Sequence, residues 1–178
     1  MLPSCWQNEL RQIIFNQASD DQRPTLFVGV GRVENGDDGA GVAVVSRLQA
    51  HNINAGRFRF IDAGAAPENL LSALFRPNPQ LVIFIDAAQM GLEPGCVRLI
   101  QLDEISSQPT VTHGISFGII GKYLQDEVGC RVMVLGIQPQ SNQPNTTLSR
   151  VISDVVQQVS DSLDALVRDV NRGKCITC

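Results

Sequence analysis

The chain has 178 residues, of which 43% are hydrophobic and 18% are charged, and its formal net charge is −4. This balance is typical of one folded domain with a real core and excludes a disordered chain. The chain is acidic and has no Lys/Arg cluster, so it lacks the basic face with which nucleic-acid-binding proteins replace phosphate counterions. We therefore predict no nucleic-acid partner.

The expected location in the cell follows from the lack of long apolar runs and from the pattern of cysteines. No apolar run approaches the ~20 residues needed to cross a bilayer, and the N-terminus lacks the basic start and apolar block of a secretion signal. The five cysteines are odd in number and mostly scattered, which favours a reducing compartment over a disulfide framework. We expect a cytoplasmic protein that does not contact a membrane and is a monomer when free.

Helical and extended patterns alternate along the chain. Residues 1–24 are predicted to form an N-terminal helical extension that packs on the domain or on a partner. Residues 25–170 are predicted to form one domain, and residues 171–178 a C-terminal tail. Within the domain, strands are expected at 25–31, 58–61, 81–85, 96–101 and 131–137, and helices at 42–48, 67–75, 113–124 and 148–170.

This alternation predicts the fold class. Strands that alternate with helices indicate an α/β three-layer sandwich, with a mainly parallel twisted sheet flanked by helices. The strands at 25–31 and 81–85 are near-continuous apolar runs, which is typical of strands buried on both faces. In such sheets, functional groups gather beyond the carboxyl ends of the strands.

Three polar side chains are placed to meet at that edge. Asp38 lies in the glycine-rich turn after the first strand, Asp86 directly follows the strand at 81–85, and His113 opens a helix. Two carboxylates and one imidazole with open coordination positions form a candidate divalent-metal site. Because 48 and 27 residues separate them (86 − 38 and 113 − 86), only the fold can bring them together.

Each of these residues also has a local interpretation. Asp37 or Asp38 would simply cap the helix that follows, since carboxylates accept its free N–H groups. Asp86, directly after an apolar strand, must be exposed, paired or metal-bound. His113 would be an ordinary histidine at a helix start. His51, the other histidine, lies on a polar helix end, so histidine-dependent chemistry falls mainly on His113.

Other chemistries fit less well. Gly29-Val-Gly31 is similar to a dinucleotide-binding turn, but Glu34 replaces the third glycine and the nearby carboxylates would repel a pyrophosphate. These carboxylates suit a cation instead. The chain has no H-E-x-x-H motif.

The cysteines are interpreted as non-catalytic. Cys96 and Cys130 lie on or beside predicted strands and are expected to be small core residues. Cys175 and Cys178 form a C-x-x-C pair, which is half of a tetrathiolate zinc site, and we interpret them as exposed thiols.

Seven motifs follow one another from about residue 26 to the last helix. They are Gly29-Val-Gly31, Gly36-Asp-Asp-Gly-Ala-Gly41, Ile61-Asp-Ala-Gly-Ala-Ala-Pro-Glu-Asn69, Ile85-Asp-Ala87, Met90-Gly-Leu-Glu-Pro-Gly95, Thr112-His113 and Leu135-Gly-Ile-Gln-Pro139. In this order they resemble the hydrogenase maturation endopeptidases, particularly the type that serves the hydrogenase of formate hydrogenlyase.

The resemblance implies a phosphorylase/hydrolase-like α/β fold and a nickel-dependent protease. It implies that Asp38, Asp86 and His113 bind the metal and form the catalytic site. The metal would be nickel carried by the substrate, the large-subunit precursor of a [NiFe] hydrogenase, whose C-terminal extension is removed. Asp62, at the end of the second strand, also matches a family position and is expected to support the pocket.

The chain departs from the family pattern at two positions. Arg32 stands where the family usually has asparagine, and Glu34 where it usually has a hydrophobic residue. Either the two side chains neutralise each other, or Glu34 supplies another ligand. The departures leave a second hypothesis open, a non-catalytic escort module of the same fold that docks on a hydrogenase precursor. A small-molecule hydrolase rests on fold analogy alone.

Overall fold

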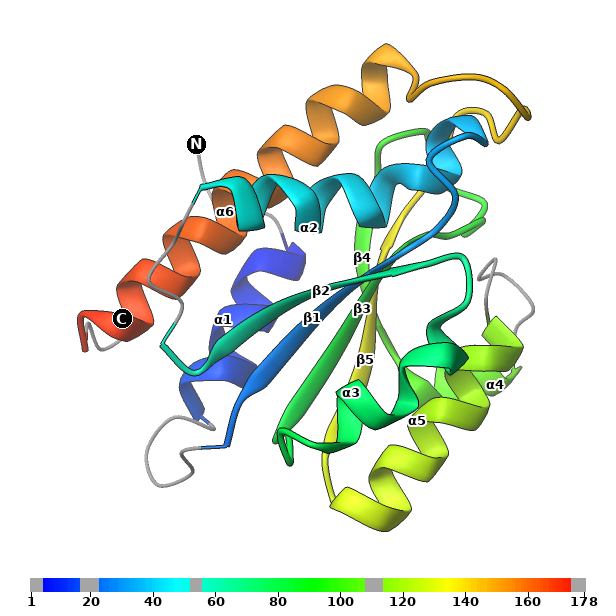
Figure 1. Ribbon diagram of the computed structural model, residues 1–178. Coiled ribbons are helices and arrows are strands. Elements are labelled where there is room, and N and C mark those ends of the chain that lie inside the picture. The colour runs from blue at the N-terminus through cyan, green and yellow to red at the C-terminus, as the bar shows by residue number, and fades with distance from the viewer. Residues whose placement is uncertain (1–4, 17–22, 52–55, 108–113, 174–178) are drawn as a thin grey trace.

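The computed structural model describes residues 5–16, 23–51, 56–107 and 114–173 (Figure 1). Within these ranges, five strands form one sheet in the order β2-β1-β3-β5-β4. The first four strands in this order run parallel to one another, and β4 pairs antiparallel with β5 at one edge. The strands are β1 Thr25–Val30, β2 Phe58–Gly64, β3 Leu81–Ala87, β4 Val97–Gln101 and β5 Arg131–Ile137.

Helices cover both faces of this sheet (Figure 1). On one face lie α1 Cys5–Asn16, α2 Ala40–Ala50 and α6 Arg150–Asn171; on the other lie α3 Leu71–Phe75, α4 Leu102–Ser107 and α5 Gly114–Val128. Short 3-10 turns, η1 Gly36–Gly39 and η2 Pro67–Leu70, precede α2 and α3. The predicted three-layer α/β sandwich with a mainly parallel sheet is confirmed.

The two central strands separate two apolar layers. Every residue of β1 and β3 is buried. Phe27 and Ile83 pack in the layer under α1, α2 and α6, whereas Val28 and Phe84 pack in the layer under α3 and α5. Successive strand residues point to opposite faces, so a strand covered on both sides must be apolar throughout. This is the pattern that the apolar runs predicted.

The N-terminal helix α1 packs on the domain. Trp6, Leu10, Ile13 and Ile14 are buried in the same layer as α6. Gln7 Nε2 donates to Ser162 Oγ at 2.7 Å, and Arg11 pairs with Asp169 at 2.5 Å. Full burial of each large apolar side chain contributes about 1.5–3 kcal/mol, so the helix is part of the core. The sequence left open whether this helix packs on the domain or on a partner, and the structure shows it packed on the domain.

Some details differ from the sequence prediction. The short helix α4 was not predicted, and the helix expected at 67–75 is divided between η2 and α3. Cys96 is exposed, so its assignment to the core is wrong; it lies in a turn, where its N–H donates to Glu93 O at 3.0 Å before the edge strand β4 begins. Cys130 is buried as expected. Among the described residues, no helix combines the length and the apolar character needed to cross a membrane.

Candidate functional site

The carboxyl ends of the parallel strands bring distant turns to one edge of the sheet. β1 lies beside β3 with Gly29 opposite Ile85, and β3 lies beside β5 with Asp86 opposite Gly136. The turn η1, which contains Asp38, follows β1 and contacts β3. The structure therefore brings the segments that carry Asp38 and Asp86 together, as the sequence predicted.

Glycines allow this close approach. Gly31 has a φ of +131°, and a Cβ there would overlap the backbone carbonyl oxygen of Asp38. A Cβ on Gly41 would overlap the carbonyl oxygen of Ile85, the residue before Asp86. Only glycine accommodates such contacts without moving the backbone. The start of α2 is thus packed directly against the end of β3.

Asp38 is 5% exposed, and its carboxylate is directed back towards the end of β1. Its Oδ2 accepts the N–H of Arg32 at 2.8 Å, the one hydrogen bond of this side chain within the described part of the chain. Neither η1 nor α2 has a side-chain cap, and their N-cap residues are Asn35 and Gly39. The interpretation of Asp38 as a helix cap is therefore wrong.

Asp37 has a different role, which sequence reasoning missed. Its carboxylate is fully buried and accepts from Gln140 N at 2.9 Å, Ser141 N at 2.8 Å, Ser149 N at 2.6 Å and Ser149 Oγ at 3.0 Å. It does not cap the helix that follows it; instead it lies at the N-terminus of α6, more than 100 residues along the chain. No local sequence pattern could have indicated these partners.

Asp86 lies within β3 and is fully buried. The sequence predicted that Asp86 is exposed, paired or metal-bound, and its burial excludes exposure. His113 lies outside the described residues, so the predicted triad stays a prediction. Within the described ranges, no group of three or more His, Cys, Asp and Glu side chains is placed to hold a metal ion.

Gln138 organises the neighbouring connection. This buried side chain follows β5, and its Oε1 accepts the N–H groups of Met90 at 2.7 Å and Leu92 at 3.3 Å. Its Nε2 donates to Gln89 Oε1 at 2.9 Å. The amide thereby holds the segment between β3 and β4 against the end of β5. This explains the presence of glutamine in the Leu135–Pro139 motif, whose structural role the sequence did not reveal.

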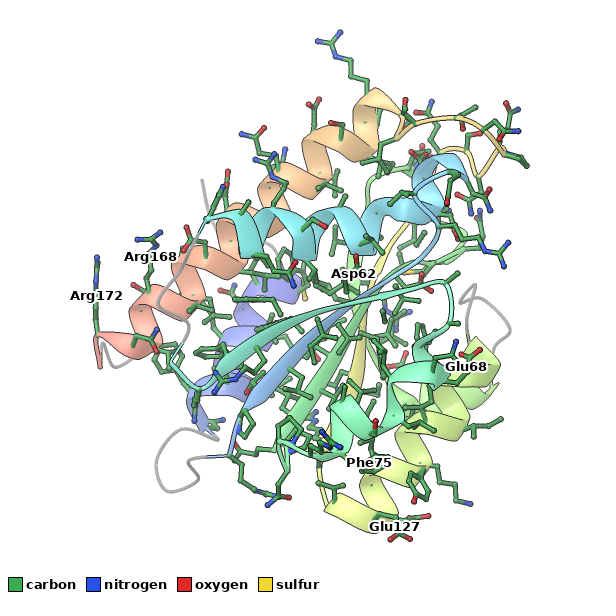
Figure 2. All side chains as sticks on the ribbon, viewed as in Figure 1. Asp62, Glu68, Phe75, Glu127, Arg168 and Arg172 are labelled. Carbon is green, nitrogen blue, oxygen red and sulfur yellow. The ribbon has the colours of Figure 1, made fainter. Side chains whose placement is uncertain are left out.

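An open cavity of about 540 Å³ lies between the β1–α2 and β2–η2 connections. Asp62 lines it, projecting from β2 towards α2 (Figure 2), and its Oδ1 accepts Gly64 N at 2.9 Å. Arg32 and Glu34 also line it, and both are exposed. Within the described residues these two form no ion pair with each other, so the alternative of mutual neutralisation by direct pairing is not observed. Ligation by Glu34 stays a prediction.

The remaining nucleophile and base candidates lie elsewhere. Burial raises the pKa of the Cys130 thiol to about 11, so it is protonated and unreactive at neutral pH. His51 is at the end of α2 opposite to η1, with its Nδ1 4.0 Å from Asp164 Oδ2. Cys175 and Cys178 lie outside the described residues. Among the described residues, the candidate reactive groups at this edge are therefore carboxylates.

Together these features define an α/β three-layer protein with three buried carboxylates, those of Asp37, Asp38 and Asp86, at the carboxyl edge of its sheet. The model of the hydrogenase maturation protease family (HycI) matches residues 42–166. The Hydrogenase 3 maturation protease of Escherichia coli strain K12 is 33% identical over 140 residues, which cover 78% of this chain and 88% of that protein.

Solved structures of hydrogenase maturation proteases are also similar to this chain. The crystal structure of the [NiFe] hydrogenase maturation protease HycI from Thermococcus kodakarensis KOD1 has the same fold, with a TM-score of 0.77, 22% identity, and coverage of 87% of this chain and 99% of that chain. The solution structure of the endopeptidase HycI from Escherichia coli has a TM-score of 0.69 and 29% identity, with coverage of 80% and 90%. The chain belongs to the hydrogenase maturation protease family, whose function is endopeptidase processing of the hydrogenase large-subunit precursor.

Proposed function

We propose that this chain is a nickel-dependent endopeptidase that removes the C-terminal extension of the nickel-loaded large-subunit precursor of a [NiFe] hydrogenase. Family membership supports the reaction and the class of substrate. The observation that carries the site assignment is the packing of the Asp38 turn against the end of β3, where Gly41 touches Ile85 and Asp86 follows. Two buried carboxylates at one edge suit a cation.

Nickel is the cargo of the substrate in this proposal. Asp38, Asp86 and His113 would complete the coordination of an ion that the precursor already holds, since oxygen and imidazole ligands suit a borderline divalent metal. Asp38 uses one carboxylate oxygen for Arg32 N–H, and its other oxygen has no hydrogen bond within the described residues. The docked ion would polarise the scissile carbonyl or activate a water for its hydrolysis.

The test is a cleavage assay on purified precursor with and without nickel, read by mass spectrometry of the released peptide. The wild-type protein should release the peptide only from the nickel-loaded precursor. Asp38→Ala, Asp86→Ala and His113→Ala should lower the rate by about 100-fold or more, as expected when a metal ligand or an oriented catalytic group is lost. His51→Ala is the matched control, because His51 lies at the far end of α2, and it should cleave normally.

Two results would contradict the proposal. Normal cleavage by all three site variants would show that these residues are not the site. Complex formation with the nickel-loaded precursor, without release of a peptide, would favour the escort module instead.

The proposal extends to the state of the free protein, a cytoplasmic monomer. Cys5 and Cys96 are exposed free thiols, which suits a reducing compartment. Light scattering after size-exclusion chromatography should give the mass of one 19.3 kDa chain. A mass of two chains would contradict the monomer.

A further inference from the structure

The Asp37 carboxylate is saturated with hydrogen-bond donors. It is fully buried, Oδ1 accepts one N–H, and Oδ2 accepts two N–H groups and the hydroxyl of Ser149. Hydrogen bonds to an ionised group are about twice as strong as neutral ones, and an unpaired buried charge is costly. The four donors therefore fix the position of this side chain tightly.

All four donors come from one segment, Gln140–Ser149, which follows β5. The backbone of η1 binds the same segment, since Asp37 N donates to Ser141 O and Gly36 N donates to Thr146 O, both at 2.9 Å. Asn35 also forms a β-bridge with Thr146. The turn and the segment are thus joined through both side chain and backbone.

This segment is itself anchored. Ser149 is the N-cap of α6, and its Oγ accepts Ile152 N at 3.4 Å. α6 packs along α2, where Ser160 Oγ contacts Val44 O at 3.5 Å. The negative charge of Asp37 at the N-terminus of this 22-residue helix is also favoured by the helix dipole. Asp37 is therefore bound to one of the largest rigid elements of the fold.

Fixing Asp37 orients the next residue. Consecutive side chains on a 3-10 helix point about 120° apart, because the helix has about three residues per turn. With Asp37 directed into the 140–149 segment, Asp38 is directed elsewhere, and its Oδ2 accepts Arg32 N–H. The other two residues of η1 are glycines, so Asp37 is the side chain that binds this turn most strongly to the rest of the protein.

We propose that Asp37 is a positioning residue for Asp38: by binding the segment Gln140–Ser149, it holds η1 so that the Asp38 carboxylate faces the reacting edge of the sheet. Asp37 itself touches neither substrate nor metal. The catalytic consequence rests on the proposed function, whereas the binding of the segment does not.

The variant that tests this is Asp37→Asn. Asparagine has the same shape, but it loses the charge and turns an NH₂ group towards an N–H donor. The matched control is Ser149→Ala, which removes one donor and the cap of α6 but leaves three backbone N–H groups on the carboxylate. We expect both variants to be less stable than the wild-type protein, but only Asp37→Asn to release η1 from the segment Gln140–Ser149. Asp37→Glu, which keeps the charge and moves the carboxylate by one methylene group, is used if Asp37→Asn does not fold.

Two measurements are made at a temperature where the variants are folded. Cleavage of the nickel-loaded precursor should show kcat lowered by roughly 100-fold in Asp37→Asn with KM changed less than about threefold, since a 1 Å misplacement costs about this much. Ser149→Ala should keep kcat within about twofold. Hydrogen exchange at the amides of Gln140 and Ser141 should be about tenfold faster or more in Asp37→Asn and unchanged in Ser149→Ala.

The outcomes separate this inference from the proposed function. A wild-type kcat in folded Asp37→Asn, or a change confined to KM, overturns the positioning role. Unchanged exchange at Gln140 and Ser141 overturns it whether or not cleavage is seen. If the wild-type protein cleaves no precursor while the exchange result holds, the proposed function fails and the anchoring of η1 by Asp37 stands.

Discussion

Two connections at the carboxyl edge of the sheet are held by the same stretch of chain in different ways. The β1–α2 connection is anchored by Asp37, a buried carboxylate that accepts four hydrogen bonds from residues 140–149. The β3–β4 connection is anchored by Gln138, a buried neutral amide that both accepts and donates. Both anchors depend on the residues that directly follow β5.

The difference between the anchors matches the difference between the connections. Charge-assisted hydrogen bonds contribute about 1.5–3 kcal/mol each, compared with about 1 kcal/mol for neutral ones. The turn with the charged anchor carries the catalytic candidate Asp38 and is buried from Gly36 to Gly39. The connection with the neutral anchor leaves Leu92 45% exposed. Of these two polar anchors, the structure thus places the stronger one beside Asp38, the proposed catalytic residue.

The largest effect on stability is expected for Asp37→Ala. It leaves four donors without their acceptor, and we expect the free energy of unfolding to fall by about 3–5 kcal/mol, the range for breaking a buried charged interaction. Urea denaturation with an unchanged m-value measures this loss. A loss below about 1 kcal/mol would mean that water or nearby groups replace the carboxylate, and that the two anchors are equivalent.

A smaller effect is expected for Gln138→Met, which keeps the side-chain length but removes the amide. The N–H groups of Met90 and Leu92 lose their acceptor, and since Leu92 is partly exposed, water can satisfy part of this loss. We expect a loss of about 1–2 kcal/mol in the same denaturation experiment. A loss equal to that of Asp37→Ala would reverse the proposed ranking of the two connections.

The smallest effect on stability is expected from a rise in pH that acts on Cys130, which precedes β5 at the opposite edge of the sheet. This effect should leave both connections unchanged. Burial raises the pKa of this thiol from about 9.0 to about 11. Between these values the unfolded chain releases the proton and the folded protein keeps it, so this stabilisation is present below pH 9 and is lost as pH rises towards 11. From pH 8 to pH 10 the loss should be about 1 kcal/mol.

Cys130→Ala serves as the comparison for that pH series, because other groups titrate in the same range. The difference between the two proteins isolates the thiol, and it should grow in favour of the variant as the pH rises. A difference that does not depend on pH would show that the thiol titrates normally.

The sequence by itself determined the order of the strands and of the longer helices, the covered sheet, the family and the burial of Cys130. The family is indicated by the ordered motifs, whereas the other properties depend on local composition and periodicity, which a single sequence displays directly. The two carboxylates of Asp37 and Asp38 beside glycines also led us to predict a cation site in the turn after β1, and that site stays a prediction. Asp38 and Asp86 could be assigned to one edge because the carboxyl ends of parallel strands meet there.

Only the tertiary structure decided which of two adjacent aspartates is the anchor. Asp37 and Asp38 are chemically identical and both follow β1, and their roles separate only because residues 140–149 fold back over η1. The same is true of Gln138, whose partners lie 46 and 48 residues away, and of Cys96, which is exposed because β4 is an antiparallel edge strand that begins one residue later. Hydrogen bonds between distant segments depend on topology, and topology leaves no periodic trace in the residues that it joins.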